Sequence, residues 1–114
     1  MLEKEIEKKL HDEVQNLHCG AKCLKFVSPG YSGVPDRIIL LPGGKVVFVE
    51  LKAPKKKERA RQEYVQRQFR NLDFTVFSTV NTVDKAKEVI EYCKKWCANY
   101  QELKCIGVAK VFTI

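Results

Sequence analysis

Apolar residues recur every three or four positions near both ends of the chain, which is typical of amphipathic helices. The first stripe consists of Leu2, Ile6, Leu10, Val14 and Leu17. We expect the helix that carries it to end at Gly20, because glycine commonly closes a helix. The last stripe consists of Val83, Ala86, Ile90, Cys93 and Cys97. It predicts a helix over about residues 82–97, and another is expected over about residues 57–72.

Between these helices, the apolar positions fall into short runs of the strand type. Residues 24–27, 38–41, 46–51 and 74–78 are expected to form strands, and residues 106–113 a late strand. The third run is apolar on both faces, through Val47, Phe48, Val49 and Leu51. A strand of this kind is usually central in its sheet. The order of helix, three strands, helix and strand predicts an α/β domain.

The second and third runs are separated by Pro42-Gly43-Gly44, which indicates a β-hairpin. A three-residue loop would pair Leu41 with Lys45 and place Asp36 opposite Glu50, with one glycine in the left-handed region. A two-residue loop would instead place the two carboxylates on opposite faces. In either case Glu50 and Lys52 share a face, because side chains alternate along a strand.

Two carboxylates held close together repel each other unless a cation or a proton lies between them. Mg²⁺ prefers oxygen ligands and needs only one or two carboxylates besides water and substrate phosphate. A bound metal can activate water for attack on a phosphodiester, and Lys52 could position that water or neutralise the developing charge. The alternative is a surface hairpin with a cross-strand salt bridge. The apolar neighbours favour the metal site, because charges beside a buried strand are costly.

A longer string of residues carries a resemblance to a known family. It comprises Ser28-Pro29-Gly30, Gly33-Val34-Pro35-Asp36-Arg37, Gly43-Gly44 and Phe48-Val49-Glu50-Leu51-Lys52-Ala53-Pro54. It resembles the VRR-NUC (virus-type replication-repair nuclease) domain of the PD-(D/E)xK nuclease superfamily, from about residue 3 to about residue 77. The resemblance implies a restriction-endonuclease-like core, α-β-β-β-α-β, with a central mixed sheet flanked by helices.

The resemblance also implies roles for individual residues. Asp36 and Glu50 would bind Mg²⁺ or Mn²⁺, with the main-chain carbonyl of Leu51 completing the metal shell. Lys52 would be the catalytic lysine, and Gln62 would orient water or substrate.

The family also has a glutamate on its first helix, which Glu3 matches best by its spacing from Ile6 and Leu10. Glu7, one turn further on, is the alternative, and either could instead be a solvated helix charge. Asp73 departs from the family pattern, where relatives tend to have glycine, but aspartate tolerates a left-handed conformation. Residues 99–114 have no counterpart in the minimal pattern.

The chain carries a net charge of +7, from 21 Lys and Arg against 14 Asp and Glu. Such a balance favours a polyanionic partner such as DNA. The expected DNA contacts are Lys55, Lys56, Lys57, Arg59 and Arg61 in the densest basic patch, with Ser28 and Arg37. The patch could also be a solvated linker and first helical turn. Tyr31, Tyr64, Trp96 and Tyr100 are either stacking platforms for unpaired bases or half-buried residues.

With 114 residues, the chain is expected to be one domain, with a core over about residues 1–80 and a helix and strand extension over about 81–114. Its five cysteines are an odd number, which argues against a disulfide framework. Cys19 and Cys23 could form a zinc site with Cys93 and Cys97, but the helical spacing of the latter two favours core positions. No secretory signal or membrane span is evident. We therefore expect the cytoplasm of a bacterium or a phage-infected host.

The resemblance is to the stand-alone, phage-like form of the family, and it implies a metal-dependent, structure-specific endodeoxyribonuclease that cuts branched DNA in the manner of a Holliday-junction resolvase. A homodimer would match the two-fold symmetry of a junction, and no small-molecule cofactor is expected. The alternatives are a nuclease for flaps, forks, nicked duplex or RNA, and a non-catalytic DNA-binding module with a nuclease-like fold.

Overall fold

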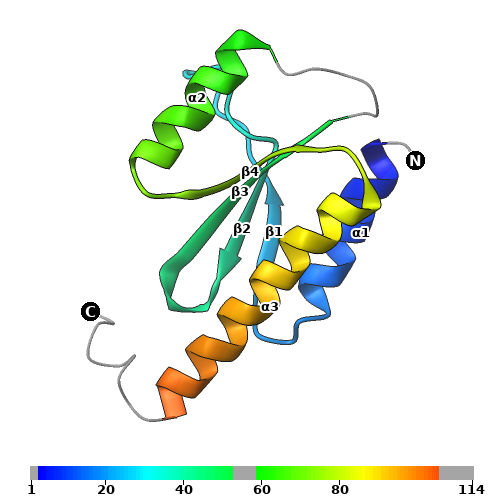
Figure 1. Cartoon of the computed structure of the whole chain (residues 1–114), viewed down its shortest axis with the longest axis vertical. Helices are drawn as coiled ribbons and strands as arrows, with labels where there is room; N and C mark the ends of the chain where they lie inside the picture. Colours follow the sequence, from blue (N-terminus) through cyan, green and yellow to red (C-terminus); the bar gives the residue numbers. More distant parts are fainter. Residues whose placement is uncertain (1–2, 53–58, 106–114) are drawn as a thin grey trace.

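Four strands form one mixed sheet, with helices on both of its faces (Figure 1). The structure is a computed structural model and describes residues 3–52 and 59–105. The elements in chain order are α1 (Glu3–Gln15), β1 (Lys22–Lys25), β2 (Arg37–Leu41), the 3₁₀ turn η1 (Pro42–Gly44), β3 (Lys45–Leu51), α2 (Ala60–Asn71), β4 (Thr75–Val80) and α3 (Val83–Cys105). The predicted α-β-β-β-α-β order is confirmed.

The strands lie in the order β1-β2-β3-β4. The first three are antiparallel neighbours, and β4 runs parallel to β3 after the crossover through α2. Because β3 lies between β2 and β4, it is an interior strand, as its two apolar faces predicted. Figure 1 shows α1 and α3 covering one face of the sheet and α2 the other.

The alternation of side chains along β3 divides the interior into two packed regions. Val47, Val49 and Leu51 belong to the main core, with buried residues of α1 and α3. Phe48 points to the opposite face, where its ring lies 4.7 Å from the ring of Phe69 on α2. Glu50 and Lys52 share the parity of Phe48, so both point toward α2.

The turn η1 sets the register of the hairpin. Leu41 pairs with Lys45 and Arg37 with Val49, so the next opposed pair outward is Asp36 and Glu50. Gly43 has a φ of 80°, which confirms the predicted left-handed glycine. The register that places the two carboxylates opposite each other is therefore confirmed.

Several element boundaries differ from the prediction. Helix α1 ends at Gln15 rather than at Gly20, and His18, between the two, already has a left-handed φ of 54°. The first strand covers Lys22–Lys25 rather than residues 24–27. It is an edge strand in which Leu24 is 46% exposed, and Val27 beyond its end is 65% exposed. The apolar run therefore did not mark the buried positions of this strand. Helix α3 continues to Cys105 instead of ending near residue 97, because residues 98–105 contain neither glycine nor proline.

The predicted late strand, residues 106–113, and the lysine run, residues 55–57, lie outside the described residues. Although α3 has 23 residues, no helix in the described part of the chain is long and apolar enough to cross a membrane.

Cys93 and Cys97 of α3 are core residues, as their helical spacing predicted. Cys93 and Cys97 are buried, together with Cys23 of β1. The Sγ atoms of Cys19 and Cys97 lie 2.8 Å apart, so the loop after α1 contacts α3 through two thiols. Burial raises the pKa of Cys23 to about 11 and that of Cys93 to about 12. Burial and the contact with Cys19 raise the pKa of Cys97 to about 12.

These raised pKa values predict that the protein loses stability in alkaline solution. Between the ordinary thiol pKa of 9.0 and about 11 to 12, the folded chain keeps protons that the unfolded chain releases. The free energy of unfolding should therefore fall as the pH rises through this range. Urea unfolding at pH 8, 9.5 and 10.5 measures the slope. Cys93→Ala should make the slope shallower, and an unchanged slope in this variant would contradict the assignment.

Candidate active site

Asp36 lies immediately before β2, and its side chain is hydrogen-bonded to β3, the strand that carries Glu50. The backbone N–H of Leu51 donates to Asp36 Oδ2 over 3.0 Å. The backbone N–H of Phe26 donates to the carbonyl oxygen of Asp36 over 2.8 Å. The side chain and the backbone of Asp36 are thus both held in place, and the carboxylate is directed to the end of β3.

Glu50 is fully buried, and a short polar network holds it in place. Gln66 Nε2 donates to Glu50 Oε2 over 3.5 Å. The hydroxyl of Ser78 donates to Gln66 Oε1, and Arg70 donates to Ser78. The network connects β3, α2 and β4, so the orientation of Glu50 depends on all three elements.

Gln66 was not among the residues predicted from the sequence. It lies one helical turn after Gln62, so both amides face the sheet from α2. A second glutamine at this spacing, next to the buried Val65, is the signal that could have identified it. We interpret Gln66 as a positioning residue for Glu50.

The sheet is irregular beside Glu50. Val49 pairs with Phe77, whereas Leu51 pairs with Val80, so β4 uses one residue more than β3 over this stretch. Thr79, within this bulge, has a φ of 53°, a conformation that β-branched residues rarely adopt. Bulges of this kind often redirect side chains near functional sites.

Lys52 follows β3 and points toward the start of α2. Its backbone N–H donates to the carbonyl of Val80 over 3.1 Å. Its ammonium donates to Gln62 Oε1 over 2.8 Å, and the same oxygen accepts the backbone N–H of Arg59 over 3.1 Å. Gln62 therefore both caps the helix and holds the lysine, on the face that carries Glu50.

The two candidate glutamates of α1 lie in different environments. Glu7 forms an ion pair with Arg37, whose side chain is only 13% exposed and whose pKa is lowered by burial. Arg37 is the residue after Asp36, so the two side chains point to opposite faces of the sheet. Glu3 begins α1 and is half-buried. The role of Glu3 stays a prediction, as does a DNA contact by Arg37.

The oxygen atoms of the candidate site are ligands of the type that a hard divalent cation prefers. Among residues 3–52 and 59–105, no group of three or more His, Cys, Asp or Glu side chains is placed to hold a metal ion. The candidate set is therefore Asp36, Glu50 and the carbonyl of Leu51. This all-oxygen set suits Mg²⁺ or Mn²⁺, which need few protein carboxylates.

The loop between β1 and β2 packs against the first turns of α2. Arg61 Nε donates to the carbonyl of Ser32 over 3.0 Å. Gly33 has a φ of 87°, and a Cβ there would lie 2.9 Å from Arg61 Cγ. Of the predicted DNA contacts, Arg59 and Arg61 are exposed beside this loop, and Ser28 is half-buried within it. The loop that leads to Asp36 is thus in direct contact with Arg61 of α2.

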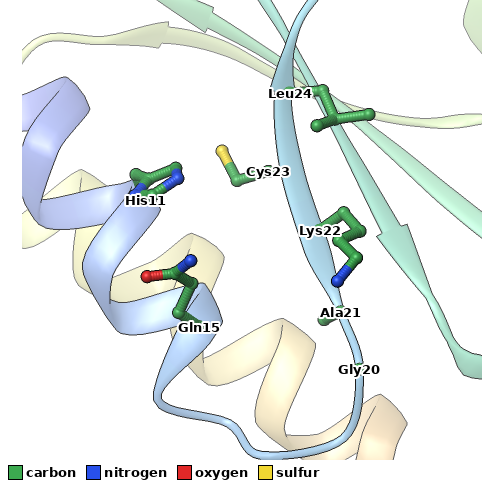
Figure 2. Close-up of a pocket in the computed structure, with 7 residues that line it drawn as sticks. All are labelled: His11, Gln15, Gly20, Ala21, Lys22, Cys23 and Leu24. Atoms are coloured by element: carbon green, nitrogen blue, oxygen red, sulfur yellow. The ribbon is translucent and has the colours of Figure 1, made fainter.

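A separate cleft lies between α1 and β1 (Figure 2). Its lining residues are His11, Gln15, Gly20, Ala21, Lys22, Cys23 and Leu24. The cleft contains none of the predicted site residues. Because burial raises the pKa of Cys23 to about 11, its thiol is neutral at ordinary pH and is a poor nucleophile. The residues that line this cleft include no carboxylate, so the cleft does not resemble the site at Asp36 and Glu50.

In this α/β domain, Pro35-Asp36 immediately before β2 faces the end of β3 that carries Glu50, the arrangement that the resemblance to the PD-(D/E)xK superfamily implied. The chain is similar to a solved structure described as "VRR_NUC domain", with a TM-score of 0.68 and 28% identity, over 78% of this chain and 94% of that one. It is also 54% identical over 55 residues to "Putative nuclease p44" of Acyrthosiphon pisum secondary endosymbiont phage 1. That match covers 48% of this chain and 57% of the relative. No family model matches the chain. Together the two similarities bear out the resemblance to VRR-NUC domains.

Proposed function

We propose that the protein is a Mg²⁺- or Mn²⁺-dependent endodeoxyribonuclease that cuts branched DNA. The observation that carries the proposal is the register that places Asp36 opposite Glu50, with Lys52 on the same face and bound to Gln62 over 2.8 Å. The nuclease name of the phage relative supports the reaction class. Because the chain spans little more than half of that relative's length, its activity, substrate and partners are part of the proposal.

The divalent cation would be held by Asp36, Glu50 and the Leu51 carbonyl, where it would activate water and stabilise charge on the phosphodiester. Other groups of the protein position the carboxylates and the lysine. The Leu51 N–H fixes the Asp36 carboxylate, and Gln66 orients Glu50. The Lys52 ammonium, held by Gln62, lies where it can stabilise the charge that develops on the attacked phosphate.

A homodimer acting on a four-way junction is the finer part of this proposal. One VRR-NUC-type domain carries one candidate site, and symmetric cleavage of a two-fold junction requires two. The phage source of the relative supports action in the cytoplasm of an infected bacterial cell. The net charge of +7 supports a DNA partner.

The test compares cleavage of a labelled four-way junction with that of its matching linear duplex, in Mg²⁺, Mn²⁺ or EDTA. We expect metal-dependent cutting of the junction alone, lost in Asp36→Asn. Cutting of both substrates would retain the nuclease and reject the junction preference. Binding without cutting in either metal would favour a DNA-binding module. A monomeric mass by light scattering, with full junction cleavage, would contradict the dimer.

A further inference from the structure

An arginine on α2 contacts two exposed tyrosines beside the candidate active site. The guanidinium carbon of Arg61 lies 4.6 Å from the ring centroid of Tyr31 and 5.4 Å from that of Tyr64. The two tyrosines are 40% and 43% exposed. We refer to Tyr31, Arg61 and Tyr64 as the tyrosine–arginine cluster. Tyr31 and Tyr64 are far apart in the sequence, and only the packing of the loop against α2 brings them together.

The cluster is held in a defined position relative to the catalytic groups. Arg61 directly precedes Gln62, the residue that accepts the hydrogen bond from Lys52. Tyr31 lies in the loop that leads to Asp36, and Arg61 Nε donates to the carbonyl of Ser32 in that loop. The cluster is thus built on the two segments that also carry Asp36 and Gln62.

The other aromatic side chains considered for base stacking are engaged inside the protein. Trp96 Nε1 donates to the carbonyl of Pro42 over 2.7 Å. Tyr100 packs over Gly43, where an added Cβ would lie 2.8 Å from its ring. Both side chains extend from α3 to η1, whereas Asp36 and Glu50 lie at the opposite end of the hairpin. Of these four residues, Tyr31 and Tyr64 are the exposed ones, and they lie on the loop that leads to Asp36 and on the helix that carries Gln62.

We propose that the tyrosine–arginine cluster binds a nucleobase left unstacked or unpaired at a branch point, with Arg61 contacting a neighbouring phosphate, and so favours branched DNA over linear duplex. The inference rests on the proposed function. An aromatic ring stacks on any base, without regard to sequence. A base in an intact duplex has both faces covered by its neighbours, whereas an unpaired base can offer one. The guanidinium adds the charge complementarity that a DNA backbone requires.

The test measures DNA binding in EDTA, so that it does not depend on cleavage. The probes are a linear duplex, a forked duplex with unpaired arms, and the same fork with abasic residues in those arms, each followed by fluorescence anisotropy. Tyr31→Leu/Tyr64→Leu should weaken fork binding about tenfold or more, because stacking of each base is worth about 1–3 kcal/mol. Duplex binding should not change. The wild-type protein should bind the abasic fork about as weakly as the double variant binds the normal fork.

Two controls separate stacking from folding. Tyr31→Phe/Tyr64→Phe keeps both rings and should bind the fork like the wild type. Tyr100→Leu removes a tyrosine at the opposite end of the hairpin and should also leave fork binding unchanged. Equal fork binding by the wild type and the Leu double variant would overturn the proposal, as would an equal loss on duplex. If the double variant fails to fold, an abasic fork that binds the wild type as tightly as the normal fork would overturn it. Because no outcome depends on cleavage, failure of this inference is distinct from failure of the nuclease proposal.

Discussion

Replacement of Lys52 with alanine is expected to lower the rate of DNA cleavage by about 100- to 1,000-fold, the range for loss of one preorganised charge stabiliser. The ammonium is held by Gln62 Oε1 at 2.8 Å and shares a face with the buried Glu50. Because its charge acts on the attacked phosphate, the loss should fall on the cleavage step. Single-turnover cleavage with saturating enzyme measures this step separately from DNA binding.

Lys45→Ala is the matched control, because Lys45 begins the strand that Lys52 follows. Its ammonium donates to Thr75 Oγ1 over 2.8 Å and lies over the rings of Tyr92 and Trp96. Its removal should lower stability by about 1 kcal/mol and leave the cleavage rate near that of the wild type. A near wild-type rate for Lys52→Ala, or equal losses in both variants, would refute the catalytic assignment of Lys52.

Asp36→Asn is expected to abolish both cleavage and stabilisation by metal, without lowering the stability of the metal-free protein. The asparagine oxygen can still accept the Leu51 N–H that Asp36 accepts at 3.0 Å. The substitution also removes the repulsion between two opposed carboxylates. Mn²⁺ at 100 times its dissociation constant should stabilise the wild type by about 2.7 kcal/mol. Thermal unfolding in Mn²⁺ and in EDTA measures this difference.

Asp73→Asn provides the control for this experiment. Asp73 is exposed, lies in the turn after α2 and has a φ of 69°, which asparagine also adopts readily. The variant should respond to Mn²⁺ as the wild type does. A full response in Asp36→Asn, or a strong loss of metal-free stability, would contradict the assignment of Asp36 as a metal ligand.

The central hairpin could be predicted from local sequence, because its determinants are local. Gly43 permits the left-handed turn, and this turn length sets the pairing of Leu41 with Lys45. Strict alternation then places Asp36 opposite Glu50. The left-handed turn at Asp73 was predictable for the same reason. The edge strand β1 was misplaced by two residues, because its burial depends on a neighbouring strand rather than on its own pattern.

The remainder of the site could not be predicted, because its parts come from elements far apart in the chain. The network from Arg70 through Ser78 and Gln66 to Glu50 spans α2, β4 and β3. It exists only once the crossover returns β4 alongside β3.

The sequence by itself determined the α/β class and the hairpin, and it limited the register to a two- or a three-residue loop, since turn chemistry and side-chain alternation act over a few residues. Only the tertiary structure decided that Glu7 pairs with Arg37 and that Tyr31 meets Tyr64 around Arg61. Contacts of this kind depend on how a helix and a loop pack against the sheet. That packing is decided by the interior as a whole rather than by any local stretch of residues.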